Sequence, residues 1–204
     1  MTKVGRFITF EGIDGAGKST QHQWLIEHLR AQGRDIVGTR EPGGTPLGER
    51  LRAVLLSEAM HIETEALLMF AARREHIELV IRPALEGGAW VVCDRFVDAS
   101  MAYQGGGRGL SADRLAELAR WTVGGLAPDL TFLFDLPVGT ALARLQAGTQ
   151  VPDRFEREKV DFFERVRSSY LAIARANPDR VCIVNATLSR ADIQVILKEQ
   201  IASY

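Results

Sequence analysis

Apolar residues form two kinds of pattern along this chain: short runs that are predominantly apolar, and longer stretches in which they recur at helical spacing. Five short runs are predominantly apolar and are bounded by Gly, Pro or charged residues, as expected of strands buried in a parallel sheet. These runs are residues 7–10, 35–39, 90–93, 130–136 and 181–184. Between them, apolar residues recur three and four positions apart, which is the spacing of helices. The pattern therefore predicts an α/β fold, with a mostly parallel five-stranded sheet and helices on both of its faces.

The helical stretches have recognisable ends. Pro83 should kink or split a long helical pattern, and Ser189 with Asp192 three residues later should cap the last helix. A glycine-rich loop is expected over residues 103–109. The expected helices cover residues 19–32, 47–55, about 63–86, a stretch from 111, a stretch through 144, residues 162–173 and a stretch from 189.

Residues 7–20 read FITFEGIDGAGKST, a strand-like run followed by the pattern G-x-x-x-x-G-K-[ST]. Glycines let the backbone approach an oxyanion, and the amides of the bend and of the following helix point at phosphate oxygens. Lys18 would neutralise the β- and γ-phosphates, and the Ser19 hydroxyl would ligate Mg²⁺. A turn that binds nothing is the alternative, but strand, loop, lysine and helix follow in the right order. The sequence predicts a P-loop NTPase-type fold whose ATP site comprises Gly12, Ile13, Asp14, Gly15, Ala16, Gly17, Lys18, Ser19 and Thr20.

The whole-chain properties exclude several classes of protein. The 204 residues fit one domain, with 46% apolar and 25% charged residues. A net charge of −1 produces no field that would favour nucleic acid or a membrane surface. Neither a signal peptide nor a membrane span is apparent. Cys93 and Cys182 lie in apolar runs and are expected to be buried, reduced thiols of a cytoplasmic protein.

A P-loop alone does not separate a kinase from a GTPase or a motor, but the arginines add information. Parallel sheets bind ligands beyond the carboxyl ends of their strands, so Lys18, Glu41 and Arg95 should converge there. Guanidinium groups grip a phosphate bidentately, and Arg95 follows a buried strand and Asp94 directly. A second phosphate, carried by an acceptor, is therefore expected near these arginines.

The chain resembles the bacterial thymidylate kinases along essentially its full length. The motifs that carry this resemblance are FEGIDGAGKST, TREPGGTPLGERLR, MFAARREH, CDRF, DASMAYQGGGRG, PDLTFLFDLP and DRFERE. It implies transfer of the γ-phosphoryl group of ATP to dTMP with Mg²⁺, for dTTP synthesis, by a homodimer. The alternatives are another P-loop nucleoside monophosphate or deoxynucleoside kinase, or a nucleotide-dependent switch.

The resemblance also implies a role for individual side chains. Asp14 corresponds to the carboxylate for the 3′-hydroxyl, and Arg95 to the arginine that clamps the dTMP phosphate. Tyr103 corresponds to the ring that occupies the 2′-hydroxyl position. Asp94 joins the catalytic set, and either Met69 or Phe70 packs on thymine. The implied dTMP-binding residues are Asp14, Glu41, Arg52, Met69, Phe70, Arg73, Arg95, Ser100, Tyr103 and Gln104.

A short mobile lid is expected over about residues 144–157, because this stretch is polar and contains Gly and Pro. It departs from the family pattern, since no basic residue lies between Arg144 and Arg154. Arg154 is the predicted transition-state cation, and Arg144 is expected toward the adenine.

Overall fold

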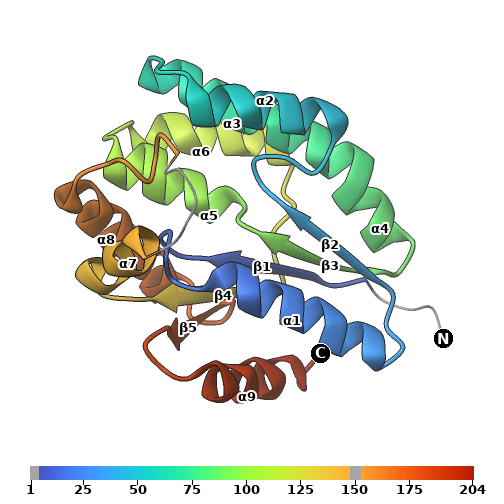
Figure 1. Cartoon of the computed structure of the whole chain (residues 1–204). Coiled ribbons are helices and arrows are strands. Elements are labelled where there is room, and N and C mark those ends of the chain that lie inside the picture. Colours follow the sequence, from blue (N-terminus) through green and yellow to red (C-terminus); the bar gives the residue numbers. More distant parts are fainter. Residues whose placement is uncertain (1–4, 148–152) are drawn as a thin grey trace.

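The computed structural model describes residues 5–147 and 153–204. Its centre is a five-stranded sheet of order β2-β3-β1-β4-β5, in which every pair of neighbours is parallel (Figure 1). The sheet and its position in the chain agree with the prediction. The strands are β1 (Phe7–Glu11), β2 (Ile36–Arg40), β3 (Trp90–Asp94), β4 (Leu130–Asp135) and β5 (Val181–Asn185).

Helices cover both faces of this sheet, as predicted (Figure 1). On one face lie α1 (Lys18–Ala31) and α9 (Arg190–Ile201). The helices of the other face are α2 (Pro46–Ser57), α3 (Ile62–His76), α4 (Arg82–Glu86), α5 (Val97–Ser100), α6 (Ala112–Val123) and α8 (Val160–Ala176), with α7 (Val138–Gln146) packed against α8.

The alternation of side chains along β1 explains the two-sided core. Ile8 and Phe10 point into the cluster that contains the apolar residues of α1. Phe7 points the other way, into a cluster with Val91 and Phe96. Both faces of β1 are therefore buried, which is why its sequence is predominantly apolar and does not alternate with exposed polar residues.

The long helix is interrupted as predicted, although not at the proline itself. A π-helical segment, η1 (Ile77–Ile81), separates α3 from α4, and Pro83 occupies the first turn of α4. Proline has no N–H for the regular i→i−4 bond and its ring clashes with the preceding turn. Because Pro83 follows the π-helical segment and lies in the first turn of α4, its missing N–H group is tolerated.

The glycine-rich stretch is not a loop, and this expectation was wrong. Residues Met101–Gly107 form a second π-helical segment, η2. A Cβ on Gly106 would lie 2.6 Å from Cβ of Ser169, so glycine permits close packing of η2 on α8. The stretch is thus a helix–helix contact, which is a different use of glycine from turn formation.

Two smaller expectations can be compared with the structure. Both cysteines are free, but only Cys93 is buried, whereas Cys182 is partly exposed on β5. Ser189 caps α9 by accepting a hydrogen bond from the Asp192 amide at 3.2 Å, as predicted. Of the predicted lid, residues 148–152 lie outside the described part of the chain, and the single-domain organisation stays a prediction.

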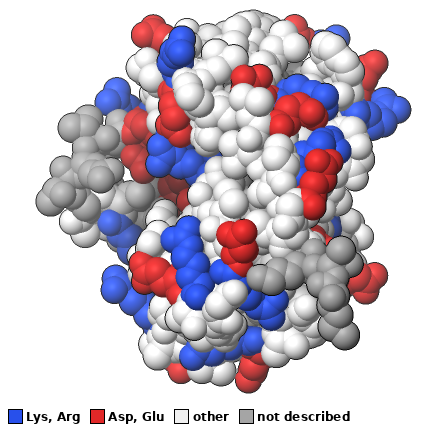
Figure 2. Space-filling model, turned by 90° about the vertical axis from the view of Figure 1, so that its right-hand side faces the viewer, with Lys and Arg blue, Asp and Glu red and all other residues white. Residues whose placement is uncertain are grey.

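Figure 2 shows basic and acidic side chains interspersed on one face of the molecule. Within residues 5–147 and 153–204, no helix combines the length and the apolar content needed to cross a bilayer.

Candidate active site

The loop between β1 and α1 is shaped by close contacts that exclude side chains. A Cβ on Gly12 would lie 2.5 Å from the carbonyl oxygen of Phe134, and one on Gly15 would lie 2.4 Å from that of Ala141. Both glycines also have positive φ angles, 133° and 80°. The loop therefore packs closely against β4 and α7, where only glycine fits.

Lys18 begins α1 and is buried under this loop. Its Nζ donates a hydrogen bond to the carbonyl oxygen of Ile13 at 3.0 Å, and only 6% of the residue is exposed. Gly17 precedes the helix without any side-chain cap. Burial lowers the pKa of Lys18 from its ordinary value, and the nearby Arg95 cation lowers it further. A bound polyanion would reverse both effects, because it would add negative charge beside the ammonium group.

Arg95 is held in a backbone conformation that is uncommon for arginine. Its φ is 73°, in the left-handed region, and its amide donates to the carbonyl oxygen of Phe10 at 2.9 Å. The next amide, that of Phe96, donates to Oε1 of Glu11 at 2.7 Å. Two hydrogen bonds to β1 and its last residue therefore stabilise the bend that aims this side chain across the ends of the strands.

The guanidinium of Arg95 joins β3 to the P-loop and to η2. It donates to Asp14 Oδ1 at 2.5 Å and to the Tyr103 hydroxyl at 3.2 Å, while that hydroxyl donates to Asp14 Oδ2 at 2.9 Å. Burial opposes ionisation of Asp14, but Arg95 and Lys18 outweigh it, so the pKa of the Asp14 carboxyl is lowered. Three residues of separate segments thus form one rigid charged unit.

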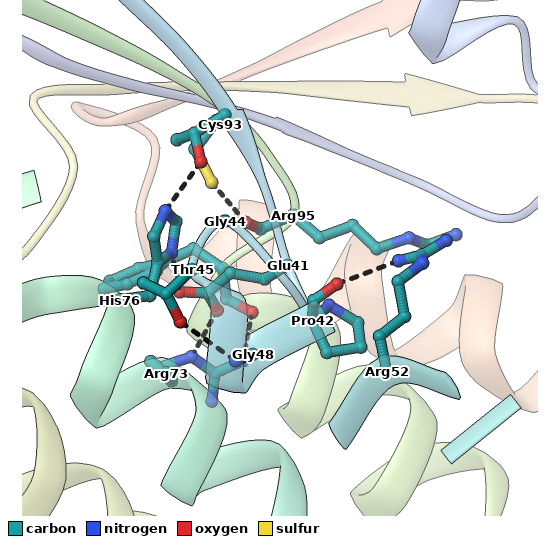
Figure 3. Close-up of polar contacts among 12 residues, drawn as sticks. Glu41, Pro42, Gly44, Thr45, Gly48, Arg52, Arg73, His76, Cys93 and Arg95 are labelled. Atoms are coloured by element: carbon teal, nitrogen blue, oxygen red, sulfur yellow. Dashed lines mark hydrogen bonds and ion pairs between the residues drawn. The ribbon is translucent and has the colours of Figure 1, made fainter. Parts of the chain in front are cut away.

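A second buried network fixes Arg73 (Figure 3). Arg73 Nε donates to Glu41 Oε2 at 2.6 Å, and the other oxygen of Glu41 contacts His76 Nδ1 at 2.9 Å. His76 Nε2 reaches the Thr39 hydroxyl at 2.7 Å. Arg73 Nη2 donates to the carbonyl oxygen of Phe96 and to Ser100 Oγ, at 3.0 and 3.1 Å.

One atom of this network is left over. Arg73 Nη1 is buried and has no hydrogen-bond partner among the described residues. An unpaired buried donor is costly, commonly about 1–3 kcal/mol. This N–H group therefore requires an acceptor that the protein does not provide.

These two networks border one cavity of about 560 Å³, including space open to solvent. Arg52 lies at its mouth, where its Nη1 donates to the carbonyl oxygen of Pro42 at 3.0 Å, and Figure 3 shows its side chain beside that of Arg95. The cavity is lined by Asp14, Glu41, Pro42, Arg52, Leu56, Met69, Arg73, Arg95, Ala99, Ser100, Tyr103, Gln104, Asp153 and Phe155.

Met69 and Phe70, the two candidates for the base-stacking residue, have different positions. Met69 lines the cavity. Phe70 is completely buried in a separate cluster with Ala66 and Leu115, and its ring lies 4.6 Å from the Arg73 guanidinium carbon. Phe70 therefore packs against the guanidinium of Arg73. This geometry does not support the prediction that Phe70 contacts the ligand directly.

Arg144 and Arg154, the two arginines of the predicted lid that were assigned roles, both contact other parts of the chain. Arg154 Nη1 lies 2.6 Å from Glu65 Oε2, and its Nε and Nη2 donate to the carbonyl oxygen of Leu55. It does not line the cavity, so its predicted role as transition-state cation has no support in this conformation. Arg144 donates twice to the carbonyl oxygen of Ala186, at 3.2 Å, and so joins α7 to the turn after β5.

The magnesium prediction named Ser19, and the structure places Asp94 near it. Both line a second, open cavity beside the P-loop. Asp94 Oδ1 is buried and has no hydrogen-bond partner among the described residues, so it can accept from a metal-bound water. No group of three His, Cys, Asp or Glu side chains suited to a metal occurs in the described residues. A hydroxyl, a carboxylate and phosphate oxygens nevertheless form a suitable donor set for Mg²⁺, which keeps several waters.

Three residues of the site were not recognised in the sequence. Glu11 was detectable as a charged residue at the end of an apolar strand, immediately before Gly12. Glu65 is 1% exposed on α3 and contacts Gln104 and Arg154. Tyr170, on α8, donates to Glu11 Oε2 at 2.8 Å. For Tyr170 no local signal existed, because its hydrogen-bond partners Glu11 and Arg95 lie 159 and 75 residues earlier in the chain.

A P-loop at the end of β1 faces Arg73 of α3 and Arg95, which follows β3, across one cavity, and this arrangement is typical of the P-loop nucleoside monophosphate kinases. A model of the thymidylate kinase family matches residues 10–195. The chain is 61% identical over 199 residues to a thymidylate kinase of Cupriavidus metallidurans, covering 98% of each chain. It is 58% identical over 204 residues to one of Ralstonia pickettii, covering 98% of this chain and 99% of that one.

The fold comparison agrees with the sequence comparisons. A crystal structure of thymidylate kinase from Ehrlichia chaffeensis superposes with a TM-score of 0.80 at 32% identity, covering 97% of this chain and 99% of that one. The chain belongs to the thymidylate kinase family.

Proposed function

We propose that the chain transfers the γ-phosphoryl group of ATP to dTMP, giving dTDP and ADP, with dTMP in the cavity described above. The observation that carries this proposal is the unpaired Nη1 of Arg73. Thymine presents O4, a carbonyl acceptor, at the edge opposite its sugar. A cytosine base would present an amino group there and leave the buried donor unpaired.

The base and the sugar are read by neutral groups of the same cavity. Met69 would lie against the thymine ring, since a thioether packs well on an aromatic face. Gln104 would hydrogen-bond the polar edge, and the Tyr103 ring would occupy the space of a 2′-hydroxyl group. The Tyr103 hydroxyl is fixed by Asp14 and Arg95, which makes this steric contact rigid.

The charged end of the cavity would hold the two reacting phosphates. Arg95, with Arg52 beside it, would grip the phosphate of dTMP, and Lys18 with the P-loop amides would hold ATP. Ser19 would ligate Mg²⁺ and Asp94 would hold one of its waters. Bound Mg²⁺ neutralises charge on the transferring group. Positioning and charge neutralisation are what phosphoryl transfer requires of a protein, and the chain supplies both.

An ADP-release assay tests the function directly. ADP formation should depend on dTMP and should be much slower with dUMP, dGMP, AMP or thymidine as acceptor. Acceptor-independent hydrolysis would instead indicate a nucleotide-dependent switch, and preference for another acceptor would indicate a different kinase.

We also propose that the enzyme is a homodimer. Trp121 on α6 and Leu67 on α3 are 79% and 54% exposed, and both line one groove between these helices. Exposed apolar surface of this kind is typical of protein–protein contacts. Sedimentation should give twice the mass of the chain, and Trp121→Arg should give the monomer. A monomeric wild-type protein would contradict the proposal.

A further inference from the structure

Glu65 is a buried carboxylate next to the base end of the cavity. It lies on α3 and is 1% exposed. Its Oε1 accepts a hydrogen bond from Gln104 Nε2 at 2.8 Å, and its Oε2 lies 2.6 Å from Arg154 Nη1. A second cation is near, because Arg108 Nε lies 3.7 Å from Oε1. A buried carboxylate with such partners is an acceptor and offers no proton of its own.

This contact determines which way round the amide of Gln104 lies. An amide group has a donor end and an acceptor end of nearly equal size, so only its partners decide between the two orientations. Glu65 can satisfy the donor end alone. The NH₂ group of Gln104 is therefore turned toward α3, and its carbonyl oxygen Oε1 is turned away from Glu65, on a residue that lines the cavity.

Glu65 is itself prevented from rotating. Arg154 holds Oε2, and the same guanidinium donates through Nε and Nη2 to the carbonyl oxygen of Leu55 at 3.1 and 2.9 Å. Leu56, the next residue, lines the cavity. The series of contacts that orients Gln104 therefore runs from α2 through Arg154 and Glu65, and it does not involve the ligand.

We propose that Glu65 is a positioning residue for base selection, which fixes Gln104 so that it offers a carbonyl oxygen to the ligand. A thymine ring carries a hydrogen on N3 and can donate to that oxygen. A cytosine ring has a lone pair on N3, and the two acceptors would repel each other. The inference rests on the proposed function, in which Gln104 hydrogen-bonds the polar edge of the base. It adds the residue that fixes the orientation of the Gln104 amide.

The test compares dTMP with 5-methyl-dCMP, which has the same sugar, phosphate and methyl group and differs only at the base edge. In Glu65→Gln, the new amide can accept from Gln104 or donate to it, so Gln104 is free to turn over. The ratio of kcat/KM for dTMP to that for 5-methyl-dCMP should fall by about tenfold or more. Glu65→Asp keeps an acceptor-only group and should retain the wild-type ratio to within about threefold.

A matched control and two further variants separate the possible failures. Glu75→Gln makes the same chemical change on α3 at a partly exposed position and should leave the ratio unchanged. A loss of packing alone would lower both efficiencies equally and keep the ratio constant, which would overturn the inference. If Gln104→Ala also leaves the ratio constant, it is the proposed role of Gln104 that fails. If Gln104→Ala lowers the ratio and Glu65→Gln does not, only the role of Glu65 is refuted.

One measurement needs no folded variant of Glu65. The side-chain NH₂ protons of Gln104, assigned in the wild-type enzyme by their loss in Gln104→Ala, should exchange slowly with solvent because they are held by a buried carboxylate. Fast exchange of these protons would overturn the inference even if Glu65→Gln did not fold.

Discussion

Replacing Glu11 with glutamine should make the enzyme more stable, by an amount that grows with pH. Glu11 ends β1 and is 1% exposed. Burial, reinforced by the charge of Asp98, raises the pKa of its carboxyl from 4.5 to about 8. The folded chain therefore keeps a proton on Glu11 at neutral pH, whereas the unfolded chain has lost it.

The sign follows from this difference. Between pH 4.5 and about 8 the folded state binds one more proton than the unfolded state, so each rise in pH favours unfolding. The slope is at most about 1.4 kcal/mol per pH unit, and over this window it amounts to several kcal/mol. The contribution of protonated Glu11 to the unfolding free energy is fully present below pH 4.5 and is lost as pH rises toward about 8. Above that pH the loss of unfolding free energy stays constant.

Glutamine should remove this dependence and keep the local geometry. Its carbonyl oxygen can accept from the Phe96 amide, as Oε1 of Glu11 does at 2.7 Å, and its NH₂ can donate to the Tyr170 hydroxyl oxygen. Arg95 would therefore stay in place.

Urea unfolding at several values from about pH 5 to about pH 9 measures the effect as the difference in unfolding free energy between variant and wild type. That difference should rise through the window and then level off. Glu199→Gln, an exposed change of the same kind on α9, should give a flat difference. A flat difference for Glu11→Gln as well would refute the reasoning, because it would mean that Glu11 is ionised in both states.

Three further predictions concern the active site. Lys18→Ala should lower kcat by on the order of 10²–10³-fold, because the charge of Lys18 would face ATP. Its affinity for dTMP, measured by calorimetry, should be unchanged, and an equally large loss of dTMP affinity would contradict this prediction. Arg95→Ala should weaken dTMP by about 1.5–3 kcal/mol more than thymidine, since only dTMP carries the phosphate; equal weakening would indicate a purely structural arginine. Tyr103→Ala should raise the relative efficiency with the ribonucleotide analogue of dTMP, and an unchanged ratio would exclude a steric role for the ring.

The fold was predictable because its determinants are local. Each strand is a short apolar run, and the P-loop pattern identifies the strand that precedes it and the helix that follows. The same local reasoning misjudged residues 103–109. Four glycines in a short stretch favour a loop on propensity alone. The contact with α8 overrides that propensity, and α8 begins more than fifty residues later.

The site was predictable in its residue types but not in its pairings. Arg73 and Arg74 are adjacent and chemically identical, so composition cannot rank them. On α3 they point about 100° apart. Arg73 is 3% exposed and is paired with Glu41, whereas Arg74 is 48% exposed and is paired with Glu78, which lies in η1. Only the packing of α3 among α2, α6 and η2 decides which of the two enters the cavity.

The same limitation explains why the sequence could not reveal the pairing of Arg154, whose role as transition-state cation stays a prediction. Its position beside the lid and its charge are both properties of the sequence, and both suit a cation for the γ-phosphate. Its partner is not such a property, because Glu65 lies about ninety residues earlier on α3 and looks like an ordinary helical glutamate. A buried carboxylate needs a cation, and removing one partner of such a pair commonly costs about 3–5 kcal/mol. Arg154 would have to give up that pairing to reach ATP. In the described conformation its charge is therefore paired with Glu65, and the proposed grip on the phosphates falls to Lys18, Arg95 and Arg52.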